Sequence, residues 1–108
     1  MLPWGRTGML LGQDVRCPNA WAELKWTGAE LVLVAVSETV DGWQGTCRIA
    51  SGFSAVHGIP VCAVNRSPAP DEPEFAGGSF ACDSAGSEVI ANQNGLIVLS
   101  IPESGSEE

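Results

Sequence analysis

The sequence has few basic residues. Only 5 Lys and Arg stand against 13 Asp and Glu, so the formal net charge is −8, and no run of basic residues is present. Proteins that bind nucleic acids neutralise phosphates with clustered Lys and Arg. The composition therefore predicts no nucleic-acid partner, and the same negative charge disfavours binding to anionic membrane surfaces.

Long apolar runs are also lacking, since no stretch approaches the roughly 18 apolar residues that cross a bilayer. The N-terminal residues Met-Leu-Pro-Trp-Gly-Arg-Thr-Gly do not show the basic region, apolar run and cleavage site of a signal peptide. We therefore expect no membrane segment and no secretion. Together these absences predict a soluble, cytoplasmic protein.

Closely spaced cysteines are absent. Cys17, Cys47, Cys62 and Cys82 lie far apart in the sequence, and none belongs to a Cys-x-x-Cys pair. Zinc sites and redox motifs use short, regular cysteine spacings. Separated cysteines in a cytoplasmic protein favour buried, reduced thiols over a disulfide framework or a metal site. We expect no metal and no cofactor.

The residues that are present predict an α/β domain. The chain of 108 residues suits one domain. The apolar run Gly8 to Gly12 indicates a first strand buried on both faces. A helix is predicted from Pro18 to Thr27 with Gly28 as its C-terminal cap. The β-branched run Leu31 to Val36 is the clearest strand, and the alternation predicts parallel pairing.

The second half continues this alternation and then changes character. A loop over residues 37–42 is followed by helical spacing from Trp43 to His57. A further strand is expected at Ile59 to Val64, and a hairpin follows later in the chain. The remaining segments are an exposed loop at residues 67–74, a hairpin at 78–91 with its turn at 84–87, a last strand at 95–101 and a disordered acidic tail at 102–108.

Four short motifs occur in one order along the chain. They are Asp14-x-Arg16-x-Pro18, Ala63-Val64-Asn65-Arg66, Phe75-Ala76-Gly77-Gly78-Ser79 and Asp83-Ser84-Ala85-Gly86. In this order and spacing they resemble the second half of a nitrilase-type carbon–nitrogen hydrolase domain, over about residues 6–101. The resemblance implies an α/β fold that is part of an α-β-β-α sandwich. Residues 1–101 would form a single partial domain.

The resemblance also implies a missing catalytic site. Members of the family hydrolyse nitriles, amides or carbamoyl groups with a Cys nucleophile, a Glu base and a Lys that stabilises the intermediate. The position that matches the nucleophile is Gly12, next to the backbone amide of Gln13. The family's Glu and Lys lie well upstream, whereas eleven residues precede Gly12. We therefore expect a truncated or degenerate hydrolase-like chain with no catalytic residues and no activity alone.

Several other polar residues have structural interpretations. Asp14 and Arg16 are expected to hold the strand-to-helix elbow by pairing or by bonding to backbone, with recognition of a substrate carboxylate by Arg16 as the alternative. Glu23 and Lys25 lie two apart on a helix and therefore face different directions, so they are expected to be surface charges. The family's usual Glu-Asn on the second helix is replaced here by Val56-His57.

His57 is expected to cap or flank the end of the second helix, and a nucleophilic pair with Cys62 is the alternative. The three helical tryptophans Trp21, Trp26 and Trp43 are expected in the core or at an interface rather than around a ligand.

Three functions remain open from the sequence. The chain is a degenerate relative kept for binding or assembly, a fragment of a split amidase or nitrilase completed by another chain, or a small α/β binding module. A family-type sheet leaves one apolar face without a covering layer. We therefore expect self-association or a complementary half-domain as the partner.

Overall fold

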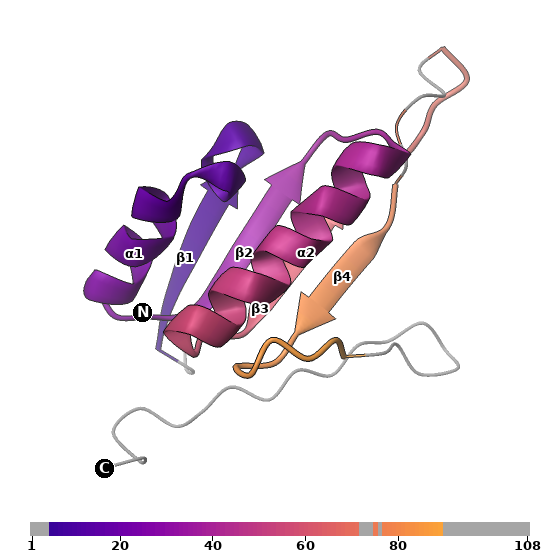
Figure 1. The fold of residues 1–108 in the computed structure, drawn as a ribbon. Helices are drawn as coiled ribbons and strands as arrows, with labels where there is room; N and C mark the ends of the chain where they lie inside the picture. Colours follow the sequence, from indigo (N-terminus) through magenta and orange to yellow (C-terminus); the bar gives the residue numbers. More distant parts are fainter. Residues whose placement is uncertain (1–4, 72–74, 76, 90–108) are drawn as a thin grey trace.

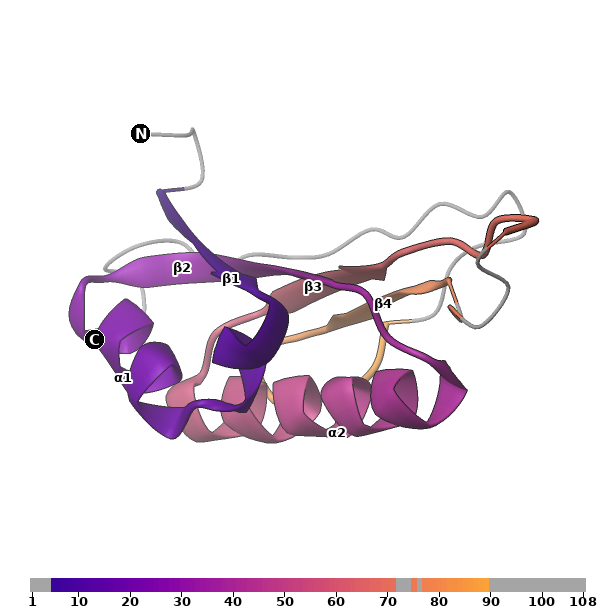
Figure 2. The same ribbon diagram turned by 90° about the horizontal axis from the view of Figure 1, so that it is seen from above.

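The computed structural model describes residues 5–71, 75 and 77–89, which form one mixed sheet with its helices on one side (Figures 1 and 2). The strand order is β1-β2-β3-β4, in which β1, β2 and β3 are parallel and β4 is antiparallel to β3. The elements are β1 (Arg6–Leu11), the 3-10 helix η1 (Gly12–Arg16), α1 (Pro18–Trp26), β2 (Ala29–Val36), α2 (Val40–His57), β3 (Val61–Asn65) and β4 (Ser79–Cys82).

The core lies between the sheet and the two helices. Alternate residues of β2, such as Val32 and Val34, are buried against the helices because side chains alternate between the faces of a strand. Trp21 of α1 is 1% exposed and stacks on Phe53 of α2, with ring centroids 5.2 Å apart. The indole Nε1 of Trp21 donates to the carbonyl of Val15 at 2.8 Å. This bond satisfies the polar edge of a deeply buried ring.

The predicted order strand, helix, strand, helix, strand is confirmed. The second helix begins at Val40, inside the segment that we expected to be a loop. Pro60 precedes β3, and its carbonyl accepts a hydrogen bond from the Val32 amide at 3.0 Å. Proline lacks a backbone donor, so this arrangement places it at the start of the strand, where only its carbonyl is needed.

Two predictions about burial are wrong. The strand expected to be buried on both faces is β1, an edge strand in which only Leu10 is buried, whereas Met9 is 59% and Leu11 is 56% exposed. Within the described residues β1 pairs with β2 alone, and α1 covers only one of its faces. Cys17 was expected to be buried, but it is exposed because it precedes α1 at the surface. All four cysteines are free thiols.

The predicted hairpin is confirmed over its described part. The Asp83 amide donates to the Ser87 carbonyl at 2.9 Å, and the Val89 amide donates to the Ala81 carbonyl at 2.8 Å. Residues 90 and 91, the predicted last strand and the predicted tail lie outside the described residues. No helix in the described part of the chain has both the length and the apolar character needed to cross a membrane.

Candidate functional site

The carboxyl ends of the parallel strands meet at one edge of the sheet, where ligands bind in many open α/β folds. Gly12 follows β1, Ser37 and Glu38 follow β2, and Asn65 ends β3. The matched pairs Leu11 with Ala35 and Val36 with Asn65 place these ends side by side. This edge therefore brings together Gly12, the polar residues that follow β2, and Asn65 of the second motif.

Gly12 forms the turn from β1 into η1. Its φ is +57°, in the left-handed region that favours glycine, and no atom lies within 4 Å of where a Cβ would be. An open pocket of about 310 Å³ is lined by Gly12, Gln13, Ala35, Val36 and Ser37. Among the described residues, the lining contains no thiol and no ionisable side chain, and its one hydroxyl belongs to Ser37.

Arg16 holds the elbow through Glu38 rather than through Asp14. The Arg16 Nη2 atom lies 3.5 Å from the Glu38 Oε2 atom and 3.4 Å from the Gly42 carbonyl oxygen of α2. Thr46, which is fully buried, donates its hydroxyl to the same Glu38 oxygen at 2.8 Å. Asp14 contributes its backbone carbonyl, which accepts from the Cys17 amide at 3.0 Å. Glu38 thus links η1, the end of β2 and α2.

Asn65 links the ends of three strands. Its Oδ1 accepts from the Glu38 amide at 2.7 Å, and its Nδ2 donates to the carbonyls of Glu38 and Gly77 at 3.0 and 3.1 Å. The backbone amide of Asn65 donates to the Gly78 carbonyl at 2.9 Å. The sequence motif contains Asn65 but does not indicate these partners, because they lie 12 and 27 residues away. Asn65 and Glu38 are the structural centre of this edge, and sequence reasoning had assigned neither a role.

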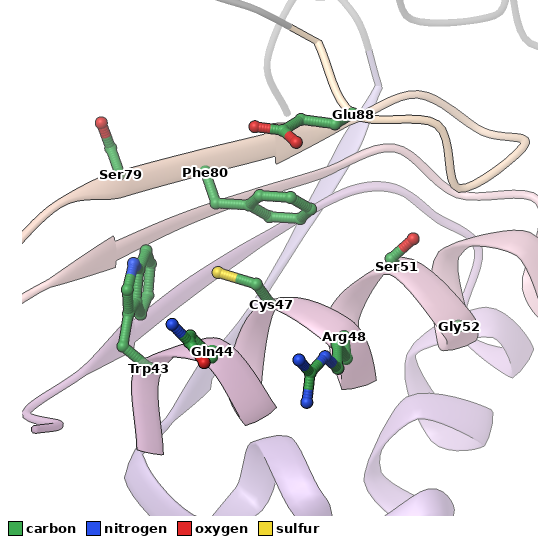
Figure 3. Close-up of a pocket in the computed structure, with 9 residues that line it drawn as sticks. All are labelled: Trp43, Gln44, Cys47, Arg48, Ser51, Gly52, Ser79, Phe80 and Glu88. Carbon is green, nitrogen blue, oxygen red and sulfur yellow. The ribbon is translucent and has the colours of Figure 1, made fainter. Parts of the chain in front are cut away.

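A larger groove of about 650 Å³ lies between α2 and the β4 edge (Figure 3). Figure 3 shows the Cys47 side chain directed into this space, near Trp43 and Phe80. Burial raises the pKa of the Cys47 thiol from 9.0 to about 11, and the charges of Glu88 and Cys82 act in the same direction. The thiol therefore stays protonated near neutral pH, which is the opposite of an activated nucleophile.

The remaining cysteines and His57 give no catalytic arrangement in the described structure. Burial raises the pKa values of the Cys62 and Cys82 thiols. The His57 ring stacks on Phe53, with centroids 6.1 Å apart, at the end of α2. It forms no hydrogen bond with Cys62, so the geometry offers no support for the alternative Cys-His pair.

The other polar and aromatic predictions fall on different surfaces. Glu23 and Lys25 are exposed on α1, as expected for surface charges. Trp21 is in the core, Trp43 is partly buried beside the groove, and Trp26 is 89% exposed. The tryptophans therefore do not surround a common ligand site.

No protein-family model and no curated protein matches the sequence. Solved structures do match. The chain is 21% identical to a carbon–nitrogen hydrolase from Helicobacter pylori G27 (TM-score 0.65; 80% of this chain and 36% of that chain). It is 20% identical to a glutamine-dependent NAD+ synthetase from Acinetobacter baumannii (TM-score 0.72; 95% and 23%).

A third match is a cysteine-to-alanine mutant of the Nesterenkonia AN1 amidase from the nitrilase superfamily, at 26% identity (TM-score 0.71; 82% and 35%). Another structure of that amidase carries the acetamide moiety of fluoroacetamide on its active site cysteine. The chain spans between 23 and 36% of the lengths of these three proteins. The fold of this chain is therefore that of a segment of a carbon–nitrogen hydrolase domain of the nitrilase superfamily.

Proposed function

We propose that the chain is a non-catalytic relative of the carbon–nitrogen hydrolases and acts through binding or assembly rather than turnover. The observation that carries this proposal is Gly12 at the end of β1. By the resemblance of the motif Asp14-x-Arg16 that follows it, Gly12 takes the place of the family's nucleophilic cysteine. The Nesterenkonia amidase forms its covalent adduct at an active site cysteine. A glycine at the corresponding position has no atom that can form this bond.

The surroundings of Gly12 support the same conclusion. Of the described residues that line the pocket, Ser37 alone has a hydroxyl, and a serine needs an adjacent base to attack a carbonyl carbon. The nearby carboxylate of Glu38 accepts from Thr46 and faces Arg16 at 3.5 Å. These two contacts therefore hold the Glu38 carboxylate beside the first turns of α2. The ordered elbow supports a chain that keeps the fold of the hydrolases without their chemistry.

The proposal is tested by repairing the nucleophile. Gly12→Cys introduces a thiol where a Cβ meets no atom within 4 Å, and Gly12→Ala is the matched control with the same left-handed backbone strain. We expect neither variant, nor the unaltered chain, to hydrolyse simple amides or nitriles, because a nucleophile without its base and oxyanion-stabilising group loses most of the acceleration. Hydrolysis by the cysteine variant above that of the alanine variant would contradict the proposal.

Intact-mass measurement after incubation with fluoroacetamide gives a second readout. The unaltered chain is expected to form no adduct at neutral pH under conditions that modify an active amidase. An adduct on one of the native cysteines that forms with amidase-like rates would show that the chain has a working nucleophile elsewhere.

A second candidate is a fragment of a split hydrolase completed by another chain. It is favoured by the short span of this chain relative to the solved structures, at most 36% of the three compared above. Such a companion would have to provide the nucleophile, the base and the lysine. Amide hydrolysis by a mixture of the two chains, with the thioester on the companion, would support this candidate over the first.

A further inference from the structure

The groove between α2 and β4 has one face of a helix on one side and a strand on the other. Trp43, Cys47 and Ser51 are four residues apart on α2, so they lie on the same face of the helix and point toward β4 (Figure 3). Phe80 of β4 faces the helices, as does Cys82 two residues later. The groove volume of about 650 Å³ is within the range of small-molecule sites, ~300 to 1,000 Å³.

Both ends of the groove are held by contacts between α2 and the chain around β4. At one end Trp43 lies against Gly78, where an added Cβ would be 3.2 Å from the Trp43 Nε1 atom. At the other end the Ser51 hydroxyl donates to the Gly86 carbonyl in the hairpin turn. The two walls are therefore held at their spacing before a ligand arrives, which lowers the cost of ordering them on binding.

A carboxylate faces this groove from the hairpin. Glu88 pairs with Cys82 in an antiparallel bridge, and residues directly opposite each other in such a pair point to the same face of the sheet. Because Cys82 belongs to the core under the helices, Glu88 is on that side as well, and it lines the groove together with Phe80 (Figure 3). After burial, the Glu88 charge is the next cause of the raised pKa of the Cys47 thiol, so it acts on the groove.

The charge that a ligand meets in the groove is negative. Glu88 and Arg48 are the two charged residues among those that line it in the described structure, and Figure 3 shows the Arg48 side chain extending away from Glu88. Within the described part of the chain, Glu88 forms no ion pair. The carboxylate of Asp83 is used in the turn instead, where its Oδ1 accepts from the amides of Ala85 and Ser87. The net charge of −8 adds a long-range attraction for cations.

We propose that this groove binds a small organic cation, with the charge beside Glu88 and the apolar part against Trp43 and Phe80. The faces of aromatic rings attract cations, and a quaternary ammonium group combines a positive charge with an apolar surface. Because its pKa is about 11, the Cys47 thiol stays protonated near neutral pH and adds a polarisable contact. The proposal goes beyond the non-catalytic role, since it assigns a ligand class to a groove that does not contain Gly12.

Three probes of nearly the same shape separate charge from size. Choline is a cation, its carbon isostere is a neutral alcohol, and the carboxylate obtained by oxidising that alcohol is an anion. Titrations up to about 50 mM at constant ionic strength are followed by NMR at the Trp43 indole N–H and the backbone amides of Cys47 and Phe80. Glu88 is exposed and the two rings are partly buried, so we expect a choline Kd on the order of 1 mM.

We expect choline to bind about tenfold more tightly than the neutral alcohol, because both the ring faces and the carboxylate act on its charge. Equal binding of these two probes, or no binding of choline, would overturn the proposal. Tighter binding of the anion would assign the groove to Arg48 and overturn it as well. Amide hydrolysis is measured separately, so any of these results leaves the proposed function standing.

Two charge variants test the role of Glu88. Glu88→Gln keeps the shape of the side chain and removes its charge, so it should lower the affinity for choline about fivefold and leave the affinity for the neutral alcohol unchanged. Glu23→Gln makes the same change in charge on α1, where the side chain is exposed, and should change choline binding by less than about twofold. An equal loss in both variants would assign the effect to net charge and reject the site.

Two tryptophan variants test the aromatic wall. Trp43→Leu removes the ring and should lower the affinity for choline about threefold or more. Trp26→Leu is the matched control, because Trp26 is 89% exposed on α1, and it should bind choline as the unaltered chain does. If circular dichroism shows that Trp43→Leu is unfolded, Phe80→Leu replaces it with the same expectation. Unchanged choline binding in a folded ring variant would reject the aromatic contact.

Alkylation of the unaltered chain locates the bound cation. Saturating choline should slow the reaction of iodoacetamide with Cys47, which points into the groove (Figure 3), and should leave the exposed Cys17 unaffected in the same sample. The neutral alcohol at the same concentration should protect Cys47 less. Choline binding without protection of Cys47, or with equal slowing of both thiols, would place the cation outside the groove and overturn the proposal.

Discussion

Replacement of Asn65 by alanine should destabilise the chain more than any change to its exposed polar residues. The side-chain amide of Asn65 makes three hydrogen bonds, two with Glu38 and one with the buried carbonyl of Gly77. A typical protein hydrogen bond contributes about 1 kcal/mol net, and buried groups left without partners cost more. The expected loss is therefore about 3 kcal/mol of the ~5 to 15 kcal/mol that stabilises a domain of this size.

Urea unfolding followed by tryptophan fluorescence measures this loss. Asn19→Ala is the matched control, because Asn19 lies in the first turn of α1 and is exposed. The control is expected to change the free energy of unfolding by less than about 0.5 kcal/mol. Both variants are compared at low protein concentration, so that association does not contribute to the measured stability.

The two variants also differ in where the structure is weakened. Hydrogen exchange should become faster at the amides of Glu38 and Gly77 in Asn65→Ala, because the clamp that joins the strand ends is lost. If Asn65→Ala and Asn19→Ala lose stability equally, or if the amide of Glu38 keeps its protection, Asn65 does not organise this edge in the way described.

Two further predictions follow from individual contacts. Iodoacetamide should alkylate Cys47 much more slowly than the exposed Cys17 at about pH 8, and the rate of Cys47 alkylation should rise with pH up to the thiol pKa of about 11. Peptide mass spectrometry measures both rates, and equal rates would show that Cys47 is not shielded. Gly86→Ala should lower the free energy of unfolding by about 2 kcal/mol or more, because its φ is +84° and a Cβ would lie 2.6 Å from the Ser51 carbonyl oxygen. The matched Gly52→Ala, within α2 and with no atom in the way, should raise stability by about 0.5 to 1 kcal/mol, and thermal denaturation of the two variants should therefore shift in opposite directions.

The order of elements could be predicted from the sequence because it depends on local patterns. The β-branched run of β2 differs in periodicity from the helical spacing before it, and Pro18 and Gly28 mark the ends of α1 through their own backbone preferences. The position of Gly12 at the end of β1 could be predicted for the same reason. The four short motifs between residues 14 and 86 also indicated the fold that the solved structures share, because each motif is local and their order along the chain can be read directly.

The environment of each strand was decided only by the tertiary structure. An apolar run bounded by glycines looks the same in a central strand and in an edge strand, so the sequence could not show that Met9 and Leu11 are exposed. Likewise, α2 begins at Val40, inside the loop predicted at residues 37–42.

The chemistry of the site depends on distant residues. Asn65 meets Glu38 and Arg16 meets Glu38 only because parallel strands bring their carboxyl ends to one edge. The sequence predicted the same burial for Cys17 and Cys47, yet Cys17 is exposed and Cys47 is partly shielded between α2 and β4. Local patterns determined which elements form and where the glycine turn lies, whereas burial, pairing and proton affinity were set by contacts between segments far apart in the chain.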